Sequence, residues 1–197
     1  MDKTDSTQLA YLAADGIIDH HHPLLIAQAK ALAIDAIQPL EVAQRCYTFV
    51  RDEIAHSMDI GAATVSCSAS QVLQNGHGLC YAKSHLLAAL LRANAIPAGF
   101  GYQRLRDDQG GFCLHGYNLV WLPAIGWYRI DARGNTGEIN AQFAPPQEQL
   151  AFTTDAPGEL DYHINLAAPL ASVVRALQQA DNTEVLRHNL PTSVYMG

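Results

Sequence analysis

The apolar positions in the first part of the chain recur at helical spacing. Between residues 40 and 54 they stand three and four positions apart, at Ala43, Cys46, Tyr47, Val50 and Ile54. This spacing places them on one face of a helix. Pro39 suits the first turn of that helix, where its missing N–H costs nothing. An earlier helix is expected over residues 24–33.

A third helix is expected to begin at Leu79 or Cys80. One of its faces would carry Leu79, Lys83, Leu86, Leu87, Leu90, Leu91 and Asn94. The helix is therefore predicted to be amphipathic and mostly buried. Just before it, Ser70 is expected to cap a short helix over residues 71–74.

Beyond Pro97 the period of the apolar positions changes from about 3.6 residues to two. Strands are expected over residues 98–105, 112–122 and 127–132, with turns at 107–111 and 123–126, a further strand near 162–166 and a helix over 169–179. Helices followed by strands indicate an α+β fold with an antiparallel sheet. The length predicts a single domain over residues 1–197.

Composition and charge exclude several classes of protein. The chain is 49% hydrophobic and 16% charged, which is normal for a globular protein and excludes wholesale disorder. Twelve Lys and Arg residues stand against nineteen Asp and Glu residues, and no basic run is present, so no nucleic-acid partner is expected. No apolar stretch reaches the roughly 20 residues of a membrane span, and residues 1–5 do not resemble a secretory signal. We therefore expect a cytoplasmic protein without a membrane partner.

Four cysteines lie at positions 46, 67, 80 and 113, too few and too far apart for a disulfide scaffold. Most isolated cysteines are small core residues. Cys80 differs because it follows Gly76-His77-Gly78-Leu79 and begins a predicted helix. A helix N-terminus carries unpaired N–H groups and partial positive charge, which favour a thiolate. Cys80 is therefore the candidate nucleophile, with the strand residue Cys113 as a weaker rival.

A cysteine nucleophile needs an imidazole to accept its proton and a third group to orient that imidazole. His115 lies in the middle of the second predicted strand, and Asp131 lies at the end of the third. If Trp121 pairs with Trp127, Asp131 becomes a diagonal neighbour of His115 on the same face of the sheet. A two-residue turn at 124–125 would instead place them on opposite faces. The catalytic interpretation therefore requires the first register or a bulge.

Three segments, in order and at close spacing, resemble the transglutaminase-like family. They are the nucleophile helix with its exit (GHGLCYAK, 76–83, and LLRANAIPA, 90–98), a histidine strand (LHGYN, 114–118) and a Trp-x-x-x-Asp strand (GWYRIDA, 126–132). The resemblance covers about residues 40–135. It implies a papain-like fold core and a catalytic Cys-His-Asp triad formed by Cys80, His115 and Asp131.

Two departures from the family pattern are present. The family usually has Gly where this chain has Ala95, and Asn94 is expected to take the left-handed cap instead. The chain also lacks the extra β domains and the Asp-rich calcium loop of the animal cross-linking enzymes. The resemblance therefore does not establish protein cross-linking.

The remaining polar candidates near Cys80 are less specific. Gln74 stands six residues before Cys80, the spacing at which papain-like proteases place a glutamine oxyanion donor. Alternatively, Gln74 is a solvent-exposed residue of a short helix with no role at the site. His77 and His85 bracket Cys80 without the paired spacing of a zinc site, so neither a metal nor a cofactor is expected.

The sequence thus predicts a thiol-dependent acyl-transfer enzyme that works through a thioester. It would be an amide or peptide hydrolase or a transglutaminase-like acyltransferase, acting on a peptide, a protein or a small amide. Arylamine N-acyltransferases use the same order of residues but are usually longer, and no coenzyme A signature is present. The alternative is a non-catalytic binding or scaffolding domain, which a sulfur walled off from every cleft would favour. The oligomeric state stays open.

Overall fold

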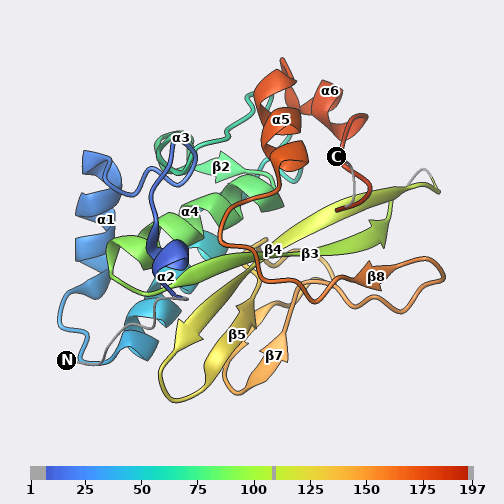
Figure 1. The fold of residues 1–197 in the computed structure, drawn as a ribbon. Helices are drawn as coiled ribbons and strands as arrows, with labels where there is room; N and C mark the ends of the chain where they lie inside the picture. The colour runs from blue at the N-terminus through green and yellow to red at the C-terminus, as the bar shows by residue number, and fades with distance from the viewer. Residues whose placement is uncertain (1–7, 108–109, 195–197) are drawn as a thin grey trace.

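The computed structural model describes residues 8–107 and 110–194 (Figure 1). The expectations for residues 1–5 and for positions 108–109 of the 107–111 turn lie outside these residues. The helices are η1 (Leu9–Leu12), α1 (Pro23–Ala33), α2 (Pro39–Asp52), α3 (Ala69–Asn75), α4 (Cys80–Ala93), α5 (Ala171–Gln179) and α6 (Thr183–Arg187). The strands are β1 (Ala55–His56), β2 (His77–Gly78), β3 (Ala98–Arg106), β4 (Phe112–Leu122), β5 (Gly126–Ile130), β6 (Gln142–Ala144), β7 (Gln147–Gln149) and β8 (Leu160–Asp161).

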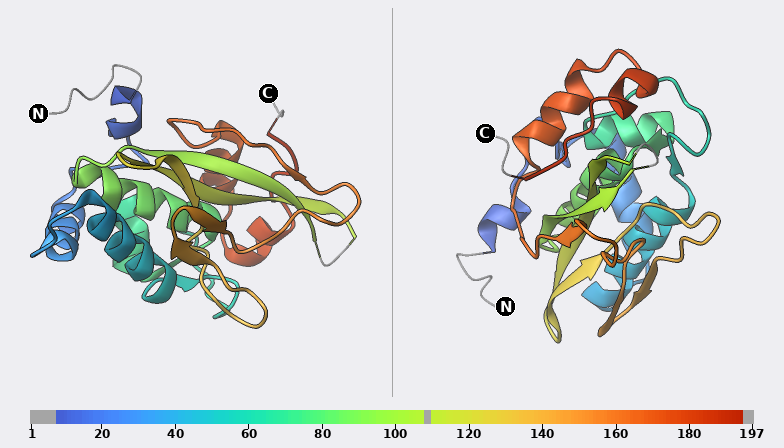
Figure 2. Two further views of the ribbon diagram at one scale, coloured as in Figure 1. Left: turned by 90° about the horizontal axis from the view of Figure 1, so that it is seen from below. Right: turned by 90° about the vertical axis from the view of Figure 1, so that its right-hand side faces the viewer.

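The helix α4 lies at the centre of the fold. Helices α1, α2 and α3 pack against it, and strands β3 and β4 contact it from the other side (Figure 2). Every residue from Tyr81 to Arg92 is buried. The expectation of an amphipathic helix is therefore wrong, because α4 is covered on all faces and its polar side chains are buried with the apolar ones.

The main sheet has the strand order β5-β4-β3-β8, and every neighbouring pair is antiparallel. Strands β3 and β4 pair along their whole length, from Ala98 opposite Val120 to Arg106 opposite Phe112. The molecule is thus an α+β fold, as predicted. Among the described residues, no helix combines the length and the apolar character needed to cross a membrane.

The β4–β5 hairpin has the register that the catalytic interpretation requires. Trp121 lies opposite Trp127, and Leu122 lies opposite Gly126. The regular pairing ends where Asn118 meets Ile130, so β5 stops two residues earlier than expected. Beyond Ile130 the chain leaves the ladder, and Asp131 is the first residue after it.

The short helix α3 has a different cap from the one expected. Ser68, not Ser70, is the N-cap, and it forms a complete capping box with Gln71. Ser70 instead binds the carboxylate of Asp19 through its backbone N–H and its hydroxyl. This long-range contact competes with capping and cannot be read from local spacing. At the other end, Gly76 has φ 70° and ends the helix.

The end of α4 also differs from the expectation. Asn94 has φ −96°, and the left-handed residue is Ala95, with φ 57°. The N–H of Ala95 donates to the carbonyl of Arg92, and the N–H of Ile96 donates to that of Leu91. This pair of bonds is a Schellman motif, which requires the left-handed conformation one residue after the C-cap. Ala95 therefore occupies the position that the family gives to Gly.

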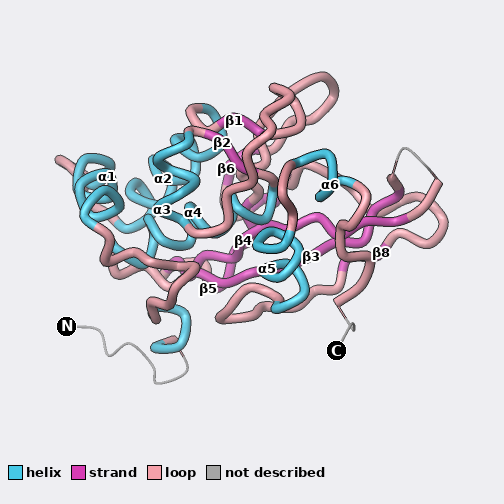
Figure 3. The backbone as a smooth tube through the Cα atoms, turned by 90° about the horizontal axis from the view of Figure 1, so that it is seen from above, coloured by secondary structure: helices cyan, strands magenta, loops and turns pink. Residues whose placement is uncertain are grey.

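Much of the chain after β5 is loop, which Figure 3 shows in pink. The expected strand near residues 162–166 is reduced to β8 and a single bridge between Leu166 and Phe100. The short β1–β2 and β6–β7 pairs and the helix α6 have no counterpart among the expected elements. Near the C-terminus the N–H of Leu114 donates to the carbonyl of Pro191, so this last segment runs beside β4.

Candidate active site

Cys80 is the first residue of α4 and lines a groove of about 1170 Å³. The N-cap residue before it, Leu79, has a side chain without an acceptor, so the first-turn N–H groups are not satisfied by their own N-cap. These N–H groups place partial positive charge next to the half-buried sulfur. The helix thus presents its electropositive end to the groove.

His115 and Asp131 form a buried pair beside the groove. His115 Nε2 lies 2.7 Å from Asp131 Oδ2, and the two residues are 4% and 0% exposed. The backbone N–H of Ala151 donates to the same oxygen, and that of Arg133 donates to Oδ1. Burial raises the pKa of Asp131, but the charge of His115 and these donors lower it below its usual range. Asp131 is therefore held as a carboxylate.

The Cys80 sulfur hydrogen-bonds with the imidazole of His115, and the two groups shift each other's pKa. Burial raises the pKa of the thiol, but the charge and hydrogen bond of His115, together with those of His56, lower it to about 6. Burial also opposes the charged form of His115, but the charges of Asp131 and Cys80 raise its pKa to about 10. At neutral pH the pair is a thiolate and an imidazolium.

Two aromatic side chains support this arrangement. The ring of Phe152 meets that of His115 edge to face, with centroids 4.9 Å apart. The hydroxyl of Tyr81 donates to the carbonyl of Leu114, which ties α4 to β4 directly beside His115. Neither Phe152 nor Ala151 carries a sequence signal for this role, because both lie in a loop that only the tertiary fold brings to the site.

A second imidazole, that of His56, also lies at the sulfur. His56 belongs to β1, lines the groove, and lowers the pKa of Cys80 through its charge and a hydrogen bond. Its Nδ1 lies 3.6 Å from Asp59 Oδ1, and Asp59 makes a two-pronged ion pair with Arg133 at 2.5 and 2.8 Å. Sequence reasoning missed His56. The signal was a histidine and a carboxylate three residues apart, directly after the predicted 40–54 helix.

The other histidine and glutamine candidates lie elsewhere. Gln74 is exposed on α3 and is not among the described residues that line the groove. His77 Nδ1 lies 2.9 Å from Ser57 Oγ, and His85 Nδ1 lies 2.8 Å from the carbonyl oxygen of Cys67. Within residues 8–107 and 110–194, no group of three or more His, Cys, Asp or Glu side chains is arranged to hold a metal ion.

The remaining cysteines divide into two kinds. Cys46 and Cys67 are buried in the core, and burial raises the pKa of their thiols to about 12 and about 11. Cys113 is half-buried and lines the groove two residues from His115. It lies inside strand β4, away from a helix N-terminus, so it lacks the electrostatic setting of Cys80.

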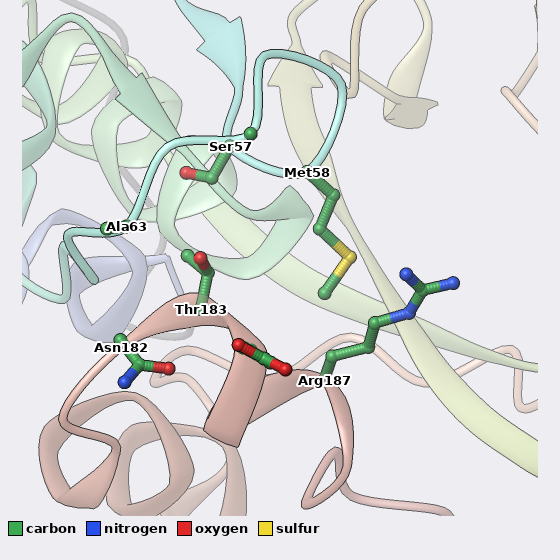
Figure 4. A pocket seen from close by; sticks show the side chains of 8 residues that line it. Ser57, Met58, Ala63, Asn182, Thr183 and Arg187 are labelled. Carbon is green, nitrogen blue, oxygen red and sulfur yellow. The ribbon is translucent and has the colours of Figure 1, made fainter.

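A smaller pocket of about 510 Å³ lies next to the groove, between the segment after β1 and the helix α6 (Figure 4). Met58 and Arg187 line both cavities. Two polar groups of the smaller pocket already have partners, since Ser57 Oγ meets His77 and the Thr183 hydroxyl donates to the carbonyl of Ala62. Cys80 and His115 line the larger groove, which is therefore the candidate active site.

A comparison with solved structures includes a protein with a similar fold. A candidate cysteine protease from Cytophaga hutchinsonii superimposes with a TM-score of 0.55 and 18% identity, covering 66% of this chain and 43% of its own. A candidate protease from Parabacteroides distasonis gives a TM-score of 0.42 and 14% identity, with 62% and 25% of the two chains covered. This chain thus spans less than half the length of either protein. No match is found among curated proteins.

The family comparison is more extensive. The model of the transglutaminase-like superfamily matches residues 20–132, which is more than half of the chain. The matched region runs from the residues before α1 through α4 and β4 to just beyond β5 and contains Cys80, His115 and Asp131. The α+β architecture agrees with the papain-like core of that superfamily. The chain belongs to the transglutaminase-like superfamily.

Proposed function

We propose that this protein is a thiol-dependent acyl-transfer enzyme in which Cys80 is the nucleophile, His115 the acid and base, and Asp131 the group that orients His115. The observation that carries the proposal is the arrangement at the start of α4. A groove-lining thiol at a helix N-terminus meets an imidazole whose Nε2 lies 2.7 Å from a buried carboxylate. These are the three parts of a nucleophilic triad.

In the acylation step, the Cys80 thiolate attacks the carbonyl carbon of an amide or ester. A C–S bond forms, and the carbonyl π electrons move to oxygen, where the N–H of Cys80 is placed to donate. Collapse of this intermediate breaks the bond to the leaving group, and the His115 imidazolium gives its proton to the departing amine or alcohol. The product is a thioester on Cys80.

In the deacylation step, a water molecule or an amine attacks the thioester carbon and gives its proton to His115. The C–S bond breaks, and the thiolate and the imidazolium are restored. Water yields hydrolysis and an amine yields transfer. Throughout, Asp131 keeps the proton of Nε2 in place and stabilises the imidazolium.

The dimensions of the groove favour a peptide or protein segment as substrate. Its volume of about 1170 Å³ exceeds the roughly 300–1,000 Å³ of most small-molecule sites. Apolar, acidic and basic side chains all line it, including Leu105, Phe112, Leu150, Arg106, Asp155 and Glu159. Such a mixed lining suits a chain with varied side chains better than a single small amide.

The features of Cys80 favour an enzyme over a non-catalytic binding domain. A binding domain would leave the sulfur closed off from the groove or far from the imidazole. Cys80 instead lines the groove, and its sulfur meets His115.

Intact-protein mass spectrometry tests the proposal. The protein is mixed with p-nitrophenyl acetate, and peptide mapping locates the acetyl group. We expect rapid acetylation of Cys80 in the natural protein and none at this position in Cys80→Ala. The control Cys113→Ala should keep the full rate of Cys80 acetylation. Acetylation that persists in Cys80→Ala at the same rate would contradict the assignment. Adding a primary amine then shows whether the thioester is resolved by water or by the amine.

A further inference from the structure

The geometry around Cys80 leaves one role open. The oxygen of a tetrahedral intermediate is best stabilised by more than one donor. The N–H of Cys80 supplies the first. His115 cannot readily supply another, because its Nε2 is bound to Asp131 and its ring also binds the sulfur. A further donor must therefore come from another group near the sulfur, and the ring of His56 lines the same groove and lowers the pKa of the thiol.

The backbone of His56 is held firmly next to the nucleophile. In the parallel β1–β2 pair, His56 lies opposite Gly78, two residues before Cys80. The N–H of Ala55 donates to the carbonyl of Gly76, and the N–H of Ser57 donates to that of Gly78, at 3.0 and 3.1 Å. These bonds bracket His56 on both sides and fix it relative to the loop that leads into α4.

A buried lysine adds a further connection to α4. The ammonium of Lys83, one turn after Cys80, donates to the carbonyl oxygens of Ile54 and Arg51. These carbonyls belong to the end of α2 and the residue that precedes β1. The helix that carries the nucleophile therefore also holds the segment that carries His56.

The ring of His56 is oriented by charge. Its side chain is 8% exposed, and Nδ1 is buried without a hydrogen-bond partner in the described part of the chain. The Asp59 carboxylate lies 3.6 Å from Nδ1 and holds that edge of the ring by charge. In its imidazolium form the ring carries an N–H on Nε2 as well. With Nδ1 turned to Asp59, Nε2 is the nitrogen left for the groove. Arg133 steadies both imidazoles, since its guanidinium binds Asp59 and its backbone N–H binds Asp131.

We propose that His56 is a further catalytic residue, whose Nε2–H donates to the carbonyl oxygen of the acyl group as Cys80 attacks it. Together with the N–H of Cys80, it forms the site that stabilises the developing oxyanion. Asp59 is a positioning residue that acts through His56. This role rests on the proposed acyl-transfer function and adds to it the group that Gln74, exposed on α3, does not provide.

Two reactions of the same thiol separate this role from a general effect on the site. Iodoacetamide alkylates a thiolate without placing charge on a carbonyl oxygen at the reacting centre, whereas acetylation by p-nitrophenyl acetate forms an oxyanion. Both rates are measured at the same pH, near 7, so that the alkylation rate of each variant reports any change in its thiolate fraction. The variants are His56→Leu, His56→Gln and the control His77→Leu, a histidine of the paired strand β2 that lies outside the groove lining.

We expect His56→Leu to lower the acetylation rate by about tenfold to a hundredfold, while its alkylation rate stays within about threefold of the natural protein. His56→Gln, which keeps an N–H near the position of Nε2, should recover part of the loss. His77→Leu should leave the ratio of the two rates unchanged. Alkylation of each variant also reports that its site is folded.

The possible failures are distinguishable. Equal acetylation of His56→Leu and the natural protein would overturn the role of His56 and leave the proposed function intact. If His56→Leu lowered the acetylation and alkylation rates equally, His56 would act only by stabilising the Cys80 thiolate. That result would overturn its role as an oxyanion donor. If Cys80 of the natural protein were alkylated by iodoacetamide but not acetylated by p-nitrophenyl acetate, both the proposed function and this role of His56 would be overturned.

Discussion

The consecutive helices α3 and α4 end in opposite ways. Helix α3 begins with the capping box of Ser68 and Gln71, and it ends at Gly76, which adopts φ 70° without strain. Helix α4 begins after Leu79, which has no capping group, and its left-handed exit is occupied by Ala95. The shorter helix is thus well satisfied at both ends, whereas the longer one is not.

The difference shows where each helix obtains its stability. A helix of seven residues needs its caps, because short helices are marginal. Helix α4 is buried on every face and is held by packing, so its start does not require a side-chain cap. Its first-turn N–H groups therefore lie next to Cys80 without a side-chain cap. In the proposed function this uncapped terminus is the end that meets the substrate, while packing stabilises the rest of the helix.

The strongest test of this contrast compares the thiol at the α4 terminus with the thiols in the core. At pH 7 we expect iodoacetamide to label Cys80 at least about a hundredfold faster than Cys46 or Cys67, since a lowered pKa and exposure favour Cys80. Its rate should be half-maximal near pH 6 and fall about tenfold per pH unit below that. Peptide mapping after timed labelling measures this. Equal labelling of the cysteines in folded protein would remove the special role of the helix start.

Asp131→Asn tests whether the α4 terminus suffices to activate the thiol. The amide removes the charge that supports the His115 imidazolium. The corresponding substitution in a serine triad lowers turnover about ten-thousandfold, which sets an upper bound on the loss expected here. We expect at least a roughly tenfold lower alkylation rate of Cys80 near neutral pH, with the fold intact by circular dichroism. The control is Asp161→Asn, an ion-paired carboxylate outside the groove lining, which should retain the rate. An unchanged rate–pH profile in Asp131→Asn would leave Cys80 and His115 as a dyad.

Ser68→Ala removes the cap of α3 and should affect stability alone. We expect the free energy of unfolding to fall by about 1 kcal/mol, measured by urea denaturation, because the N–H of Gln71 loses its acceptor. The alkylation rate of Cys80 should not change. A large loss of thiol reactivity with little change in stability would show that the two helices do not divide their roles in this way.

Ala95→Gly improves the exit of α4 and has the smallest expected effect. Ala95 is exposed, so the substitution removes strain at φ 57° with little loss of packing. We expect a gain of up to about 1 kcal/mol in unfolding free energy, since glycine adopts this conformation at lower cost. Ala93→Gly, at a helical position of the last turn, should destabilise instead.

The elements with local signals could be predicted from the sequence. The period of two predicted the strands but left two registers of the hairpin open, and the structure has the one with Trp121 opposite Trp127, which brings Asp131 toward His115. The start of α4 was expected at Leu79 or Cys80, and the helix begins at Cys80. Each of these depends on residues close together in the chain.

The parts that could not be predicted depend on distant contacts. The strands β1 and β2 have two residues each and show no periodicity, so the placement of His56 beside Cys80 becomes visible only in the fold. Ala151 and Phe152 reach the site from a loop. Gln74 had the right spacing, but the orientation of α3 leaves it exposed. Spacing to a nucleophile therefore says less about a donor than the direction of the element that carries it.

The Cys80–His115 pair also determines how folding exchanges protons with the solvent. The thiol has an ordinary pKa of 9.0, which falls to about 6, and the imidazole has an ordinary pKa of 6.5, which rises to about 10. The lowered pKa of Cys80 contributes free energy of unfolding that is present above its ordinary pKa and is lost as the pH falls through about 6. The raised pKa of His115 contributes free energy of unfolding that is present below pH 6.5 and is lost as the pH rises through about 10. Between about pH 7 and 9, folding moves one proton from sulfur to imidazole and releases none. Over that range the pair keeps its sulfur charged, and its own contribution to the free energy of unfolding does not change with pH.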